Sequence, residues 1–158
     1  MMKPTLYLET TVPSYLVSQP SRDLVVAAHQ QITNEWWAHQ REKFDIYISQ
    51  FVFDEARAGD TILAGERMKI ISKFPKLEVN QDVKYLAALL IRERIIPAKA
   101  VIDAAHIAVS AVHGMEFLLT WNCAHLANAV IAKRIQKVCL DHGFLYPVIC
   151  TPEELMGE

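Results

Sequence analysis

The segment VIDAAHIAVSAVHGMEFLLTWN, residues 101–122, contains the pattern that decides the fold class. Its first half is almost entirely Ala, Val and Ile, which predicts a largely buried helix over residues 98–113. Gly114 follows at the position where glycine commonly ends a helix. The apolar residues FLLT, 117–120, then predict a short strand. A buried helix that leads directly into an apolar strand is typical of an α/β protein.

Short β-prone segments alternate with longer helical patterns along the rest of the chain. Further strands are expected at residues 5–8, 45–49, 77–79 and 147–149. Helices are expected at residues 21–40, 50–58 and 60–74, from 81 to before Pro97, at 127–142, and in a last short helix that the capping-box sequence 151–154 begins. Strands separated by helices imply right-handed crossovers and a parallel sheet covered on both faces. We therefore expect a single α/β domain over residues 1–158.

The helix expected at residues 21–40 has a specific predicted orientation. Ser21 is the expected N-cap, with Asp23 in the first turn. The apolar stripe expected to face the core consists of Val25, Ala28, Ile32 and Trp36. Trp37 would then point elsewhere, either half-buried or as an exposed anchor for a partner or a second copy of the chain.

Charge and composition exclude several classes of protein. A formal net charge of -2 argues against broad, phosphate-driven coating of DNA, although an RNA substrate held locally or through metal ions remains open. The three cysteines match no zinc pattern, the N-terminus lacks a signal sequence, and no apolar run reaches the ~18 residues of a membrane span. We expect a cytoplasmic protein with no membrane contact. A nucleotide-binding domain is disfavoured because no glycine-rich phosphate loop is present.

Polar residues at the ends of the expected strands are the candidate site, because ligands of parallel sheets bind beyond the carboxyl ends of the strands. Glu9 and Asn122 each follow a strand, the short helix after the second strand carries Glu55 beside Asp54, and Asp103 lies in the apolar helix. Carboxylates grouped in one pocket repel one another unless they share a cation. With Mg²⁺ or Mn²⁺ they could activate a water and neutralise charge on a phosphodiester.

Each candidate also has a simpler interpretation. Glu9 could cap backbone N–H groups, Asn122 could be a turn residue, and Glu55 could be solvated beside Asp54. Asp103 could lie on an exposed line of its helix together with Lys99, His106, Ser110 and His113. His106 and His125 lie near the proposed site in the sequence. His106 could hydrogen-bond Asp103 or contact a phosphate, or it could be a half-buried helical histidine. Thr10, Thr11 and Thr120 could position water or phosphate, or cap the backbone.

Three segments in order carry a family resemblance: YLETTVPSYL at 7–16, SQFVFDEARAGD at 49–60, and residues 101–122. Together they resemble the PIN-domain family, and more narrowly the VapC-like PIN proteins of bacterial toxin–antitoxin systems. The resemblance implies a parallel sheet of four or five strands sandwiched by helices in three layers. It implies a metal-dependent endoribonuclease that uses Mg²⁺ or Mn²⁺, with an antitoxin as partner. A homodimer is also expected.

By position, the resemblance assigns Glu9, Glu55, Asp103 and Asn122 as metal-binding and catalytic residues. Two of them depart from the family pattern, which usually has aspartate at both positions. Glu9 is one methylene longer, and Asn122 keeps an oxygen ligand but loses a charge, which implies weaker binding of a divalent ion. The alternative function is therefore a catalytically weak or inactive PIN-fold module that binds RNA or a protein partner.

Overall fold

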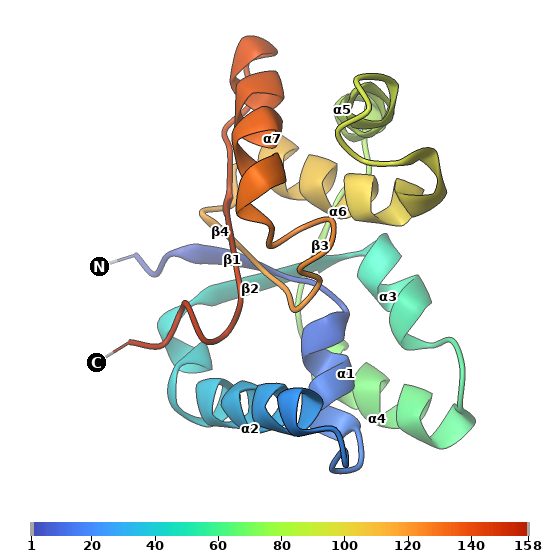
Figure 1. Cartoon of the computed structure of the whole chain (residues 1–158), viewed down its shortest axis with the longest axis vertical. Coiled ribbons are helices and arrows are strands. Elements are labelled where there is room, and N and C mark those ends of the chain that lie inside the picture. Colours follow the sequence, from blue (N-terminus) through green and yellow to red (C-terminus); the bar gives the residue numbers. More distant parts are fainter. Residues whose placement is uncertain (1, 158) are drawn as a thin grey trace.

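A five-stranded parallel sheet lies at the centre of the computed structural model, which describes residues 2–157 (Figure 1). The strands are β1 (Thr5–Leu8), β2 (Asp45–Ser49), β3 (Lys76–Leu77), β4 (Phe117–Leu119) and β5 (Val148–Cys150). Their order in the sheet is β3-β2-β1-β4-β5, and every neighbouring pair is parallel. The predicted α/β fold with a parallel sheet is therefore confirmed.

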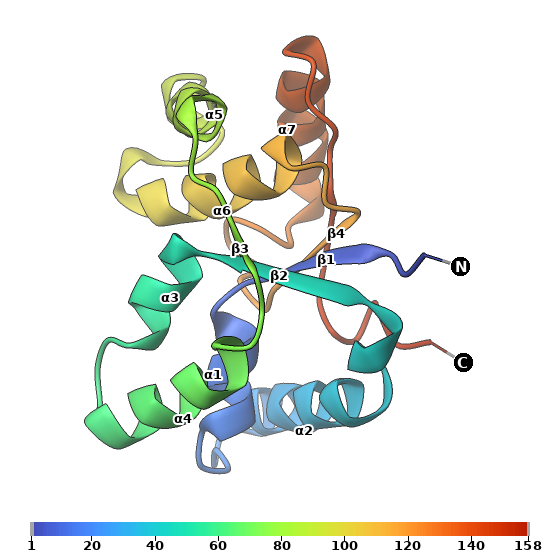
Figure 2. The same ribbon diagram turned by 180° about the vertical axis from the view of Figure 1, so that it is seen from behind.

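Helices cover both faces of this sheet, as the views from the front and from behind show (Figures 1 and 2). The helices are α1 (Thr11–Val17), α2 (Leu24–His39), α3 (Gln50–Ala56), α4 (Thr61–Ile71), α5 (Gln81–Arg92), α6 (Val101–Val112) and α7 (Ala129–Asp141). Helices α5, α6 and α7 lie on one side, α1, α2 and α4 on the other, and α3 lies where β2 ends. No helix in the described part of the chain combines the length and the apolar character that a membrane crossing requires.

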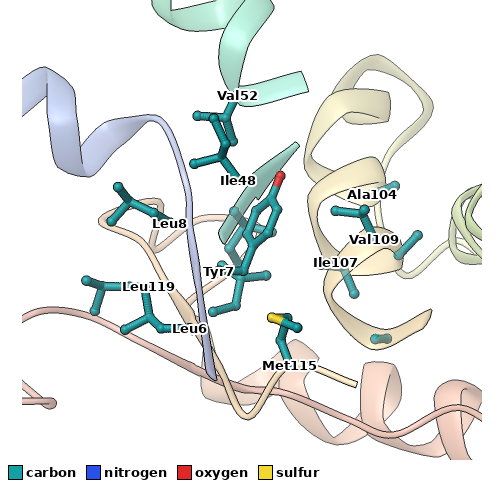
Figure 3. Close-up of a cluster of buried hydrophobic side chains, with 14 of the residues drawn as sticks. Leu6, Tyr7, Leu8, Ile48, Val52, Ala104, Ile107, Val109, Met115 and Leu119 are labelled. Atoms are coloured by element: carbon teal, nitrogen blue, oxygen red, sulfur yellow. The ribbon is translucent and has the colours of Figure 1, made fainter. Parts of the chain in front are cut away.

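The core follows from the alternation of side chains along the buried strands. Leu6 and Leu8 point to one face of the sheet, whereas Tyr7 points to the face covered by α6 (Figure 3). All three side chains have no exposed surface. Helix α6 is the central helix, because all its residues from 104 to 111 are buried. As predicted, it ends just before Gly114, whose φ of 67° is the left-handed conformation that glycine adopts readily.

The predicted orientation of α2 is wrong in two respects. Asp23, not Ser21, is the N-cap: its carboxylate accepts the N–H of Val26 at 2.9 Å. Val25 and Ala28 are exposed, and the buried residues are Gln30, Thr33 and Trp36. Polar partners explain this rotation. The Gln30 amide donates to Ser18 and to the carbonyl of Gln19, and Thr33 accepts the indole N–H of Trp121 at 2.7 Å.

Two shorter elements also differ from expectation. Helix α1 has no counterpart among the expected helices, because its sequence TVPSYLV is rich in β-branched residues and contains Pro13. Its Pro13 lies in the first turn, where a missing N–H costs little. The capping box at 151–154 does form, with the Thr151 N–H donating to Glu154 at 3.0 Å. It opens only a turn and not a helix: up to residue 157, the further helical bonds are the two that the Leu155 N–H donates to the carbonyls of Thr151 and Pro152.

Candidate metal centre

A row of polar side chains lies at the carboxyl edge of the sheet, at the last residue of β2 and one residue beyond β1 and β4. Leu8 pairs with Leu119, which places Glu9 level with Thr120. The Glu9 N–H extends the ladder by donating to the Leu119 carbonyl at 3.1 Å. On the other side Tyr7 pairs with Tyr47, which places Ser49 at the same level as Glu9. The register of the sheet thus brings three polar residues from β1, β2 and β4 to one edge.

Glu9 is held in this row by three hydrogen bonds to one of its oxygens. Oε1 accepts from the Thr120 hydroxyl at 2.7 Å, and from the hydroxyl and N–H of Thr11 at 2.5 and 3.1 Å. The residue is only 3% exposed, so these donors replace the water that a carboxylate needs. Within residues 2–157 no hydrogen bond uses Oε2, and no fully buried side-chain oxygen is left without a partner. Oε2 therefore reaches the solvent and is free to bind a ligand.

Glu55 reaches the same edge from α3. Ser49 caps this helix by accepting the Phe51 N–H. The Glu55 Oε1 accepts from Thr10 and from His106 Nε2, each at 2.7 Å. Burial acts to raise the pKa of Glu55, but the hydrogen bond from His106, the electrostatic attraction of that ring and the bond from Thr10 together lower the pKa below its usual value. Glu55 therefore carries a negative charge at neutral pH, and its Oε2 takes part in no bond with the described residues.

Together these groups form a cluster suited to a cation. Ligand atoms of Glu9, Glu55 and His106 all lie within 4.8 Å of one another. Two carboxylates this close repel, and a divalent ion would remove that cost. Mg²⁺ and Mn²⁺ prefer oxygen ligands and retain several waters, so two carboxylate oxygens are a suitable protein contribution. The donor set therefore fits the predicted ion.

Asp103 lies outside this group and forms a second cluster with Asn122 and His125. Asp103, in the first turn of α6, bonds through Oδ2 to His125 Nδ1 at 2.9 Å. Asn122 Oδ1 accepts the N–H groups of Ala124 and His125, at 3.2 and 3.1 Å. The Asn122 side chain thus stabilises a turn, which is the simpler of the two interpretations that its sequence position allowed. One bridge joins the two clusters: the Thr120 hydroxyl donates to Glu9 and accepts the Asn122 N–H at 2.9 Å.

His106 is the residue whose role was missed. The helix line proposed as exposed is not exposed at His106 or Ser110, both of which have no accessible surface. His106 does not bond to Asp103 but to Glu55, and its Nδ1 lies 2.7 Å from the Tyr7 hydroxyl. One available signal was strand parity, because Tyr7 and Glu9 lie two residues apart and so face the same side of the sheet. The contact between Tyr7 and His106 spans 99 positions and leaves no local pattern.

No family model matches the chain, and no curated protein matches it in sequence. The structure is similar to the crystal structure of Mycobacterium tuberculosis VapC20, described as a toxin that cleaves the sarcin–ricin loop. The TM-score is 0.58 and the sequence identity 16%, with 89% of this chain and 97% of the VapC20 chain covered. A likeness at this identity shows the fold, and it confirms the predicted PIN-like architecture.

Proposed function

We propose that this protein is a metal-dependent endoribonuclease that hydrolyses RNA phosphodiester bonds with Mg²⁺ or Mn²⁺. The observation that carries the proposal is the pair formed by Glu9 and Glu55 at the carboxyl edge of the sheet. Each has one oxygen held by protein donors and one oxygen free. In this proposal Asp103 and Asn122, on the adjoining helix and loop, complete the site around the ion and its water ligands.

The chain's own residues have distinct parts in this chemistry. A bound divalent ion would supply an activated water and neutralise charge on the phosphate. Thr11 and Thr120 hold Glu9, and Thr10 holds Glu55, so that neither carboxylate has to reorganise when substrate binds. Asp103 fixes the ring of His125 through Nδ1, which leaves the Nε2 atom of this partly exposed histidine to contact a phosphate oxygen.

RNA is the proposed substrate because the fold is that of a toxin described as cleaving the sarcin–ricin loop. The net charge of -2 agrees with local contact through a metal ion and not with a basic binding surface. The toxin role, with a small antitoxin as partner, and the homodimer belong to the same proposal.

A second candidate, an RNA- or protein-binding module with weak or no cleavage, is favoured by one observation. The Asn122 Oδ1 atom is already used by two backbone N–H groups, and Asp103 is bonded to His125. Of the three expected carboxylate ligands, only Glu9 and Glu55 thus lie in the group around the candidate ion position. Such a site binds a cation less tightly than one with four free ligands.

The neighbouring carboxylates Glu55 and Asp54 provide a matched test. Glu55→Gln removes a proposed ligand, whereas Asp54→Asn changes a surface residue that bonds to Gln50 and Arg57. We expect wild type and Asp54→Asn to cleave RNA with Mn²⁺ and to stop when EDTA is added. Glu55→Gln should lose at least the roughly 10- to 100-fold that loss of an outer-shell partner typically costs a metal site.

Three results would count against the proposed metal-dependent cleavage at Glu55: cleavage that survives EDTA, equal loss in both variants, or no cleavage by wild type. RNA binding without cleavage by wild type would favour the binding module instead.

A further inference from the structure

A continuous chain of hydrogen bonds runs through the core to Glu55. Ser49 Oγ lies 2.7 Å from the Tyr7 hydroxyl, which lies 2.7 Å from His106 Nδ1, and His106 Nε2 lies 2.7 Å from Glu55 Oε1. Ser49, Tyr7 and His106 have no accessible surface. Figure 3 shows the Tyr7 hydroxyl directed away from Met115, toward the end of the core that holds Val52 and Ala104. The chain connects three elements, β1, β2 and α6, to a carboxylate on α3.

The direction of each bond follows from counting donors and acceptors. Ser49 Oγ accepts the Phe51 N–H at 3.2 Å. The acceptor near the hydroxyl proton of Ser49 is then the Tyr7 oxygen. A buried hydroxyl proton without an acceptor is costly, so Ser49 donates to Tyr7. Tyr7 then donates to His106 Nδ1. The proton of the neutral imidazole is therefore on Nε2, which donates to Glu55 Oε1.

We propose that Tyr7 and His106 are positioning residues that orient Glu55, and that His106 is not a ligand of the metal. This inference rests on the proposed metal-dependent function for the identity of the ion. The Nε2 lone pair that a metal would need is replaced by a proton, although one ring nitrogen of His106 lies within 4.8 Å of an oxygen of each carboxylate. Because Oε1 of Glu55 is held by His106 and Thr10, Oε2 is left as the oxygen for the cation.

Packing of the imidazole supports a fixed orientation. The Tyr7 ring lies 5.6 Å from the His106 ring, and Phe51 meets it edge-on at 6.4 Å. A ring enclosed on these sides cannot turn to exchange its two nitrogens without displacing its neighbours. Outer partners of this kind set both the tautomer of a histidine and the orientation of a ligand.

The tautomer can be measured without metal or substrate. In metal-free protein with ¹⁵N-labelled histidine, NMR should show His106 protonated at Nε2 and unprotonated at Nδ1. Tyr7→Phe, which removes the donor to Nδ1, should change that pattern. A His106 ring protonated at Nδ1 in wild type, whether neutral or doubly protonated, would overturn the assignment.

Calorimetric titration with Mn²⁺ tests the positioning role. Tyr7→Phe should weaken binding by about tenfold, within the range for loss of an outer partner. Tyr47→Phe is the matched control, because Tyr47 is the register partner of Tyr7 on β2 and its hydroxyl has no bond to the site. We expect Tyr47→Phe to bind as wild type does. Equal affinity in Tyr7→Phe and wild type would contradict the proposal.

Two substitutions of His106 separate positioning from direct ligation. His106→Gln keeps an N–H donor near Glu55, whereas His106→Leu removes it. Positioning predicts that His106→Gln retains most of the Mn²⁺ affinity and that His106→Leu loses it. An equal loss in both would identify His106 as a ligand and refute the proposal. If wild type binds no Mn²⁺ at all, the proposed function fails, and the NMR result alone still decides the hydrogen-bond chain.

Discussion

Glu55 and Asp54 are adjacent in sequence, yet only Glu55 reaches the candidate metal centre. Successive residues of a helix point about 100° apart, so one of the two faces the edge of the sheet and the other faces solvent. Glu55 bonds to Thr10 and His106, whereas Asp54 bonds to Gln50 and Arg57 at the surface. Charge alone therefore does not identify a ligand in this helix; the position of its side chain does.

The three cysteines provide a prediction about individual residues. All are free thiols; Cys123 is exposed, whereas Cys139 and Cys150 are buried. Burial raises the pKa of Cys139 to about 11, and burial with a smaller contribution from Glu154 raises the pKa of Cys150 to about 12. At pH 8 roughly a thousandth or less of either buried thiol is the reactive thiolate. We expect a thiol reagent to label one cysteine per native chain and three after unfolding. Rapid labelling of a second cysteine in the native protein would contradict this burial.

At the scale of elements, local signals predicted most helix ends, the positions of all five strands and the exact bounds of two of them. Strands β1 and β2 have the expected bounds, Asn80 caps α5 through the Val83 N–H, and α7 ends before Gly143 as expected. These features were predictable because caps, glycine positions and short β-branched runs act over a few residues.

Elements that depend on distant partners were not predictable in the same way. Helix α1 is short and has weak intrinsic propensity, and it buries Val12 and Pro13 in the core. Helix α2 turns Thr33 inward to meet Trp121, 88 positions away. Prediction of the candidate site from the sequence is limited in the same way. Sequence placed Glu9 and Glu55 at an edge where carboxylates could meet, but the bonds of Asp103 to His125 and of His106 to Tyr7 depend on the folded arrangement.

Two glycines provide opposite predictions for the stability of their elements. Gly65 lies within α4, and an added Cβ would meet nothing within 4 Å. Gly65→Ala should raise the free energy of unfolding by about 0.5–1 kcal/mol. Gly143, just after α7, also has open space around an added Cβ, but its φ is 79°. Gly143→Ala should therefore lower the free energy of unfolding by about 1–2 kcal/mol. Denaturant titration of both variants measures the two shifts. A Gly143→Ala protein as stable as wild type would contradict the left-handed conformation.

At the scale of the whole molecule, the parallel sheet explains where the candidate site lies. Every strand ends at the same edge, so the polar residues that end β2 and follow β1 and β4 are neighbours although they are far apart in sequence. The expected homodimer has no comparable support from the tryptophan pair. Trp36 is fully buried, and Trp37 is partly covered by Arg41, whose guanidinium lies 5.0 Å from the ring, and by Phe74. The homodimer stays a prediction.

The position of a bound ion shows whether Glu9 and Glu55 form a metal centre. A crystal grown or soaked with Mn²⁺ locates the metal by its anomalous scattering. We expect one peak at the carboxyl edge of the sheet, about 2 Å from a free oxygen of Glu9 and from one of Glu55. The same peak should be absent from crystals of Glu9→Gln. Three results would contradict the proposed metal centre: a peak bound to His106 Nε2, a peak only at Asp103 and His125, or no peak at this edge.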